Sequence, residues 1–393
     1  MISVDEAKQI IREEVKALSP VQQNLTQSVG LVLAADVYAT LDIPAFNQSS
    51  MDGYAFSFAR WQLNTSLQIE GEVAAGSSET NAYSPEKVVR IFTGAAVPEG
   101  TDTVVMQEKV VVENRRLIIQ DDKLKQGGNV RLKGSEIKTG ELALAAGTLL
   151  SPAAIGFLAG MGITTVEVYP KPLVSIIVTG KELQQPGQPL QHGQVYESNS
   201  AMLTAALQQL NISNVKILWA DDDLAILKQV LQDALNESDV VLLTGGVSVG
   251  DYDFVVEAAN LCGINQLFHK IKQRPGKPLY FGKKGNQLIF GLPGNPSSVL
   301  TCFYEYVIPA LQQLSNVATG LKILQTPLAK TIEKPAGLTH FLKGFFDGEK
   351  AMPLDAQESY RLSSFARANC LIKINEGVTL CNEGELVEIH FLN

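Results

Sequence analysis

Strand-like and helix-like segments alternate from residue 173 to residue 314, and this alternation constrains the fold more than any other feature. The strand-like runs are apolar throughout, as in LVSIIVTG (173–180) and DVVLLTGG (239–246). A run such as LAILKQVLQDAL (224–235) between them indicates a helix. Because continuously apolar strands joined by helices are typical of a parallel sheet covered on both faces, we predict an α/β domain over residues 170–316.

The rest of the 393-residue chain predicts smaller, strand-rich parts. Ser3 and Glu6 have the spacing of a capping box and begin an amphipathic helix. Short β-rich runs follow over residues 66–149 and recur after Val317. A helix with Ser151 as its N-cap precedes the α/β domain. We therefore expect a multidomain chain, with an extended N-terminal part, an inserted small β module, the α/β domain and a C-terminal β domain.

Composition excludes several functional classes. A net charge of −9 argues against general nucleic-acid binding. No run approaches the roughly 18–20 apolar residues of a membrane span, and the N-terminus does not resemble a secretory signal. The cysteines lie far apart, without C-x-x-C spacing, and there is no H-E-x-x-H motif. We therefore expect a cytoplasmic protein with reduced thiols and without partners among nucleic acids or membranes.

Positive charge is concentrated in one window of this acidic chain. Residues 258–304 contain no Asp or Glu. The basic residues of the window are Lys270, Lys272, Arg274, Lys277, Lys283 and Lys284. Two explanations are equally open: the window attracts a small anion, or it is a basic edge strand protected against aggregation. Arg274 and Lys277 flank a Pro-Gly turn, which would suit a clamp for an oxyanion.

Polar loops follow the predicted strands of the α/β domain. Two are rich in glycine, GGVSVG (245–250) and GNPSS (294–298), and could bring backbone N–H groups to phosphate oxygens or simply form turns. Carboxylates follow the strands as well, at Glu182, Glu197, Asp221 to Asp223, Asp251 and Asp253. Any one of them could cap a helix, for instance Asp221 or Asp222. Their convergence on one sheet edge indicates instead a divalent cation such as Mg²⁺ between the carboxylates and a phosphate.

One further motif, NQSSMDGYA (47–55), has two interpretations. Asp-Gly is a strong turn signal, so Asp52 could simply shape a loop. Its place among the other motifs of the chain favours a second interpretation, in which Asp52 is an active-site group. The runs PAFNQSSMDGYAF, TGAAVPEGTDTVVMQE, RLKGSEIKTGE, TGKELQQPGQPL, TGGVSVGDYDF, RPGKPLYFG and GLPGNPSS occur in this order along the chain. In this respect the chain resembles the molybdopterin molybdenumtransferases, a family that includes the C-terminal part of gephyrin.

The resemblance spans the chain and implies a fold and an activity. It implies an extended N-terminal, dimer-forming domain (1–43 and 133–169) and an inserted β domain (44–132). The α/β molybdopterin-binding domain (170–316) and a small barrel-like C-terminal β domain (317–393) follow. Such enzymes are homodimers that use Mg²⁺, take adenylylated molybdopterin (molybdopterin-AMP) and molybdate, insert molybdenum and release AMP. A molybdopterin adenylyltransferase is an implied further partner.

Matching the family motifs position by position implies the site residues. The positions that match catalytic groups are Asp52, Thr93, Glu136, Glu182, Asp221 and Asp253, and Glu182, Asp221 and Asp253 among them match metal-holding groups. Those that match cofactor-binding loops or oxyanion contacts are Gly245, Gly246, Ser248, Gly250, Lys270, Arg274, Lys277, Gly294, Asn295, Ser363 and Ser364. The chain departs from the family pattern at Leu338, Lys343 and Glu358, near the C-terminus.

Two alternative functions remain at the level of sequence. The α/β domain also resembles the molybdopterin adenylyltransferase, although that activity does not need the flanking domains. A non-catalytic molybdopterin-binding scaffold is the other alternative, since fold alone does not fix function. The set of acidic residues favours the enzyme.

Overall fold

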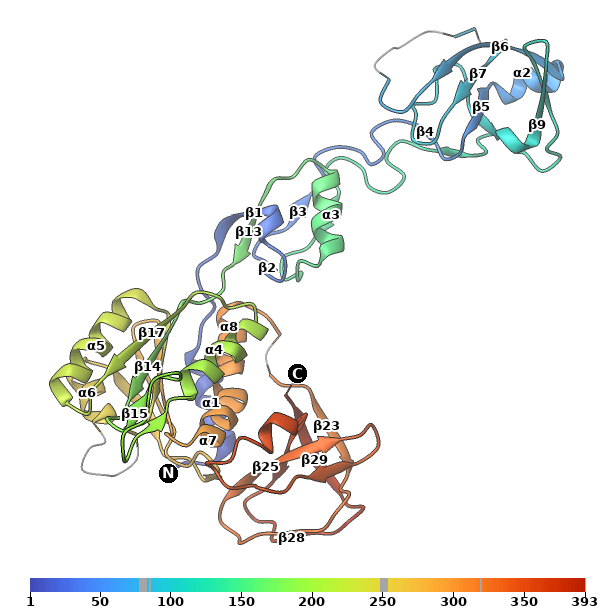
Figure 1. The fold of residues 1–393 in the computed structure, drawn as a ribbon. Coiled ribbons are helices and arrows are strands. Elements are labelled where there is room, and N and C mark those ends of the chain that lie inside the picture. The colour runs from blue at the N-terminus through green and yellow to red at the C-terminus, as the bar shows by residue number, and fades with distance from the viewer. Residues whose placement is uncertain (78–82, 85, 248–253, 319, 393) are drawn as a thin grey trace. The chain divides into compact units, whose positions relative to one another are not determined.

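The computed structural model describes residues 1–77, 83–84, 86–247, 254–318 and 320–392 (Figure 1). The chain divides into two compact units. Unit 1 comprises Met1–Val21, Gly30–Val32 and Val168–Asn393, and unit 2 comprises Gln22–Val29 and Leu33–Glu167. No helix in the described part of the chain is long and apolar enough to cross a membrane.

A six-stranded sheet forms the centre of unit 1, in the order β17-β14-β18-β22-β21-β19. Its strands are β14 (Val174–Thr179), β17 (Val215–Ala220), β18 (Val240–Thr244), β19 (Asn265–His269), β21 (Tyr280–Lys284) and β22 (Gln287–Leu292). The first four in the spatial order are parallel, as predicted, but β21 and β19 run antiparallel to their neighbours. The sheet is therefore mixed. Only Gly285 and Asn286 join β21 to β22, and a two-residue hairpin connects antiparallel strands alone.

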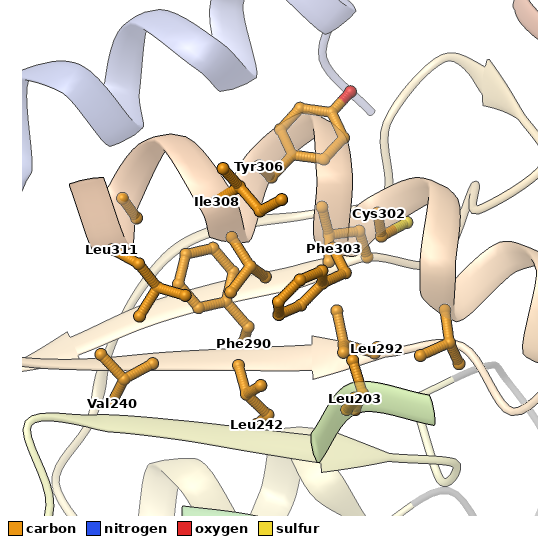
Figure 2. Packing of buried hydrophobic residues seen from close by; sticks show 14 of the residues in the cluster. Leu203, Val240, Leu242, Phe290, Leu292, Cys302, Phe303, Tyr306, Ile308 and Leu311 are labelled. Atoms are coloured by element: carbon orange, nitrogen blue, oxygen red, sulfur yellow. The ribbon is translucent and has the colours of Figure 1, made fainter. Parts of the chain in front are cut away.

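Helices cover both faces of this sheet. On one face lie α5 (Leu224–Glu237) and α6 (Val255–Leu261) (Figure 1). On the other lie α1 (Val4–Glu14), α4 (Asn199–Gln209), α7 (Pro296–Cys302) and α8 (Ile308–Leu314). A π-helix, η3 (Phe303–Val307), joins α7 to α8, so the helix predicted from 297 to 314 is continuous but locally widened. Figure 2 shows Phe303 and Leu311 pointing from this helical segment toward the strand that carries Phe290.

The first helix packs differently from the sequence-based domain division, which grouped residues 1–43 with the N-terminal domain. The predicted capping box is present, with Ser3 and Glu6 bonded reciprocally. The apolar face of α1, however, packs into the core of the α/β sheet through Val4, Ala7 and Ile11. Helical periodicity reveals which face of a helix is apolar but not which distant surface buries it.

The C-terminal part of unit 1 is a second six-stranded sheet. Its strands are β20 (Gln273–Arg274), β23 (Ile323–Pro327), β25 (Thr339–Phe346), β26 (Ala351–Pro353), β27 (Cys370–Ile374) and β29 (Leu386–Phe391). Two short pairs, β24 (Ile332–Glu333) with β28 (Leu380–Cys381) and β15 (Leu183–Gln184) with β16 (Val195–Tyr196), lie elsewhere in unit 1. Because β20 belongs to the chain between β19 and β21 yet pairs with β25, it joins the C-terminal sheet to the α/β part.

Unit 2 contains the small β domain. Its six-stranded sheet has the order β8-β5-β7-β6-β10-β9. The strands are β5 (Gly53–Phe56), β6 (Ser66–Val73), β7 (Lys87–Ile91), β8 (Thr103–Met106), β9 (Val110–Glu113) and β10 (Arg116–Ile119), with the helix α2 (Phe58–Leu63) between β5 and β6. Its shorter strands are β3 (Val37–Tyr38), β4 (Gln48–Ser49), β11 (Val130–Arg131) and β12 (Leu142–Leu144). The strands β1 (Val21–Asn24), β2 (Val32–Leu33) and β13 (Thr165–Tyr169) each have residues in both units. Ser151 caps α3 (Pro152–Gly160), which confirms that prediction.

Candidate functional site

A cavity of about 690 Å³ lies where the carboxyl ends of β14, β18 and β22 meet. Ligands of open α/β sheets bind at this edge, and the volume is in the range of small-molecule sites. Five of the residues predicted for the site line the cavity: Glu182, Gly245, Gly246, Gly294 and Asn295. The other lining residues include Thr179, Gly180, Glu197, Asn199, Asp222, Thr244, Tyr196 and Tyr360.

The carboxylates at this edge divide into structural and available groups. Glu197 is buried, and its carboxylate accepts hydrogen bonds from the backbone and hydroxyl of Ser200, so it caps the start of α4. Asp223, and neither Asp221 nor Asp222, caps α5, accepting from the backbone N–H groups of its first turn. Asp221 is exposed and is not among the residues that line the cavity. Glu182 and Asp222 therefore remain as acidic groups of the cavity, and Oδ2 of Asp222 also accepts from the backbone N–H of Lys181 at 3.1 Å. The metal role of Asp221 stays a prediction.

These acidic groups fit a Mg²⁺ ion that also binds substrate. Within the described ranges, no cluster of three or more His, Cys, Asp and Glu side chains could hold a metal. Mg²⁺ commonly uses one or two protein carboxylates and takes its other ligands from water and substrate phosphates. Glu182 and Asp222 provide that donor set. The predicted residues Asp253, Ser248 and Gly250, together with Asp251, lie outside the described residues.

Glycines at the strand ends bring the backbone close to the cavity. Gly245 and Gly246 both have positive φ angles, of 89° and 63°, which side chains rarely adopt. A Cβ atom on Gly245 would lie 2.9 Å from the carbonyl oxygen of Thr179 on the neighbouring strand. The loop therefore requires glycine for both conformation and packing, which is the arrangement needed for backbone groups to approach a ligand.

The basic residues of the window lie on an inner strand, in a turn and, for Arg274, on the edge strand β20 of the C-terminal sheet. Lys283 and Lys284 lie on β21, which is paired on both sides, so the edge-strand explanation is wrong for these two residues. Lys283 instead contacts Glu14 of α1 at 3.3 Å. Arg274 and Lys277 are exposed on either side of Gly276, which has a φ angle of 92°.

Arg274 also lines a second cavity, of about 490 Å³, against the C-terminal sheet. Lys334 and His340 line it as well. Burial, together with Lys334 and Arg274, lowers the pKa of His340 to about 4. Lys270 is half-buried with a φ angle of 70°, and its backbone joins α1 and β21 through Ile2 and Leu279.

Two C-terminal residues have structural contacts that sequence analysis did not anticipate. The Oγ of Ser364 is buried and donates to the carbonyl of Ala356 at 2.8 Å, whereas Ser363 is exposed. Lys343, which departs from the family pattern, is also buried, and its Nζ donates to three backbone carbonyls, of residues 356, 358 and 361. Desolvation lowers the pKa of this amine. Lys343 therefore holds the loop 356–361.

In unit 2 the structure brings together two of the predicted residues. Oδ1 of Asp52 accepts from the backbone N–H of Thr93 at 2.7 Å and from its hydroxyl at 2.8 Å. These bonds hold the pKa of the Asp52 carboxyl below its ordinary value. Glu136 is exposed, and its side chain makes no hydrogen bond or ion pair with any described residue. Arg90, which the sequence did not single out, lies over the rings of Tyr54 and Phe92.

Models of known protein families match three successive parts of the chain. Successive family models match residues 2–162 ("MoeA N-terminal region (domain I and II)"), 175–313 ("Probable molybdopterin binding domain") and 325–392 ("MoeA C-terminal region (domain IV)"). The chain is thus a multidomain protein built around an α/β domain of the probable molybdopterin-binding class.

Relatives extend over the full length of the chain. A molybdopterin molybdenumtransferase of Haemophilus influenzae is 32% identical over 402 residues, covering 100% of this chain and 99% of the relative. One from Nostoc sp. is 34% identical over 373 residues, covering 91% and 85%. A crystal structure of the molybdopterin biosynthesis MoeA protein from Pyrococcus horikoshii has a TM-score of 0.83 at 28% identity and covers 100% of this chain and 99% of its own. The chain belongs to the molybdopterin molybdenumtransferase family.

Proposed function

We propose that this protein is a molybdopterin molybdenumtransferase that inserts molybdenum from molybdate into adenylylated molybdopterin and releases AMP. The observation that carries the proposal is the cavity at the ends of β14, β18 and β22, with glycine turns and two available carboxylates on its lining. A phosphoanhydride with a bound cation needs those groups. Membership in the family supports the same reaction.

In this proposal, acidic residues bind the metal ion and basic residues attract molybdate. Glu182 and Asp222 would hold Mg²⁺, which when bound would neutralise phosphate charge and polarise the phosphoanhydride. The glycine turn offers the backbone N–H of Gly246 to phosphate oxygens, because the N–H of Gly245 already donates to the carbonyl of Leu292 at 3.2 Å. Arg274 and Lys277 attract molybdate as exposed cations next to the C-terminal sheet. Asp253, which lies outside the described residues, and Lys270 keep the roles implied by the resemblance.

The wider assembly is also part of the proposal. We propose the four-domain division of the sequence analysis, with α1 attached to the α/β domain. The homodimer would bring Asp52, Thr93 and Glu136 of one subunit to the reaction of the other. A cytoplasmic molybdopterin adenylyltransferase would supply the substrate, because adenylylated molybdopterin must form in an ATP-consuming step.

The decisive experiment measures AMP release from adenylylated molybdopterin by the purified protein, with Mg²⁺ and molybdate. Release is expected, and release that fails while the protein is folded overturns the proposal. Consumption of ATP with molybdopterin alone would indicate an adenylyltransferase, and tight binding without turnover a scaffold. Asp222→Asn is expected to slow release by on the order of 100-fold, and Asp221→Asn, at its exposed neighbour, tests the metal role that the resemblance implies for Asp221. A larger loss of AMP release in Asp221→Asn than in Asp222→Asn would assign the metal-binding role to Asp221.

A further inference from the structure

The interior of the cavity contains two buried polar atoms that lack partners. Asn199 is 9% exposed and Thr244 is 1% exposed, and both residues line the cavity. Asn199 Oδ1 and Thr244 Oγ1 have no hydrogen-bond partner among the described residues. Buried polar atoms in folded proteins are almost always hydrogen-bonded, and leaving one unpaired is unfavourable. Both atoms therefore call for a partner outside the described part of the chain.

A hydrogen bond from the amide nitrogen of Asn199 fixes the orientation of its side chain. Its Nδ2 donates to the carbonyl oxygen of Gly294 at 2.9 Å. Only the nitrogen of the amide can donate to a carbonyl, so Oδ1 is the atom left over, and it can only accept. The backbone around Thr244 is held as well, since its carbonyl accepts from the Thr179 hydroxyl at 3.2 Å. The missing partner of Asn199 must be a donor.

Charge divides the lining of the cavity. Glu182 and Asp222 supply its available charge, near the ends of β14 and β17. Asn199, Thr244 and Gly294 lie at the start of α4 and the ends of β18 and β22, where the carboxylate of Glu197 is buried and hydrogen-bonded to Ser200. A neutral ring needs no cation, so a heterocycle of the substrate would match this part of the lining, next to the glycine turn proposed for the phosphates.

We propose that Asn199 and Thr244 are specificity-determining residues that bind the amino-bearing edge of a heterocycle, with Asn199 Oδ1 accepting from the ring's amino group. This inference rests on the proposed function, whose substrate contains two such heterocycles, a pterin and an adenine. A site built to pair with a donor rejects an analogue that lacks it, since the site's buried acceptor is then left unpaired. The pair thus selects substrate by its amino group.

The test uses two ligand pairs whose members differ by one amino group. One pair is AMP and its 6-deamino analogue, and the other is 2-amino-4-oxopteridine and its 2-deamino analogue. Calorimetric titration of the full-length protein with Mg²⁺ is expected to show about 3- to 10-fold tighter binding of the amino-bearing member in one pair, the range of one net hydrogen bond. The pair that shows the preference identifies the adenine or the pterin as the ring bound.

Three variants distinguish a loss of ligand binding from a loss of folding. Asn199→Ala should abolish the preference. Thr244→Val removes an unpartnered hydroxyl without changing shape, so it should leave thermal stability unchanged or higher while weakening binding about 3- to 10-fold. Thr204→Val is the matched control, because Thr204 Oγ1 on α4 is also buried and unpartnered but does not line the cavity. It should not change binding.

The proposal is overturned if wild-type protein shows no preference in either pair. It is also overturned if Thr244→Val binds as wild type does, which would mean that ordered water satisfies the hydroxyl. AMP release separates the two hypotheses. Release without an amino preference refutes only this inference, and a preference without release refutes only the proposed function.

Discussion

Asp52 and Thr93 are joined through a single carboxylate oxygen: Oδ1 of Asp52 accepts both the backbone N–H and the hydroxyl of Thr93, at 2.7 and 2.8 Å. Asp42 and Thr139 repeat this geometry in the same unit, at 2.8 and 2.9 Å. The two sites can be compared, because both carboxylates bind a threonine in the same way while only Asp52 matches a catalytic position of the family. Asp42 differs in one contact, an ion pair with Lys133 at 3.4 Å.

The first prediction compares Asp52→Asn with Asp42→Asn. An amide oxygen can still accept both hydrogen bonds, so both variants should fold and unfold thermally much like wild type. AMP release should fall by on the order of 100-fold in Asp52→Asn, because the charge needed in the reaction is lost. It should be unchanged in Asp42→Asn. Equal losses in the two variants would reduce Asp52 to a loop-forming residue.

The second prediction concerns the glycine that follows Asp52. A Cβ atom on Gly53 would lie 1.8 Å from the carbonyl oxygen of Val105 on β8, so Gly53→Ala forces β5 away from its partner. We expect a loss of roughly 3 kcal/mol or more in the free energy of unfolding of unit 2, measured by urea denaturation. Gly156→Ala, in the middle of α3 with open space around it, should instead stabilise by about 1 kcal/mol. A tolerated Gly53→Ala would show that the strands can separate there.

The third prediction concerns a buried ion cluster. Glu305 is fully buried on η3, with Lys8 of α1 at 2.5 Å and His390 of β29 at 2.7 Å. Glu305→Ala removes the carboxylate that contacts Lys8 and His390 Nδ1, while His390 Nε2 keeps Glu388 at 2.8 Å, and should cost roughly 3–5 kcal/mol. A double-mutant cycle with Lys8→Ala measures the coupling. Additive losses would mean that the two charges do not interact.

The same carboxylate makes stability depend on pH. Burial alone would raise the pKa of Glu305, but Lys8 and His390 hold it below its ordinary value of 4.5. The unfolded chain therefore takes up the proton first as pH falls. The stabilisation should be complete above about pH 5 and decline progressively below 4.5, as urea midpoints between pH 3 and 7 would show. In the Glu305→Ala variant, this part of the decline in stability should be absent.

The fourth prediction follows from His340. Its pKa is about 4 in the fold against 6.5 ordinarily, so the unfolded chain binds a proton at a higher pH than the folded protein does. Stability from this residue should be present above pH 6.5 and fall as pH drops from 6.5 toward 4. His340→Leu should flatten thermal stability over that interval. The exposed His192→Gln is the control, and a profile that stays steep in His340→Leu would assign the decline to other groups.

The fifth prediction separates Lys343 from Arg274. The ammonium group of Lys343 donates to three backbone carbonyls. Lys343→Met should therefore lower the free energy of unfolding by about 1–3 kcal/mol. It should not change the molybdate concentration needed for half-maximal AMP release. Arg274→Gln should raise that concentration and leave stability nearly unchanged, since its side chain is exposed. A molybdate effect from Lys343→Met would mean that the ammonium group reaches the oxyanion.

Local patterns in the sequence determined the elements and the general place of the site. Apolar runs predicted β14, β18 and β22, the capping residues Ser3 and Ser151 predicted two helix starts, and the strand-end rule predicted the edge where the cavity lies. These signals depend on residues close together in the chain, which is why they can be recognised without a structure.

Tertiary structure decided the contacts between distant segments. It placed α1 on the α/β sheet, turned β21 and β19 antiparallel, and exchanged Asp221 for Asp222 in the cavity lining. It also gave the Lys343 ammonium group its carbonyl partners and left Asn199 Oδ1 and Thr244 Oγ1 without a partner among the described residues. Such outcomes depend on which surfaces and polar groups meet in three dimensions, and a single residue of offset in a loop changes which side chain faces a ligand.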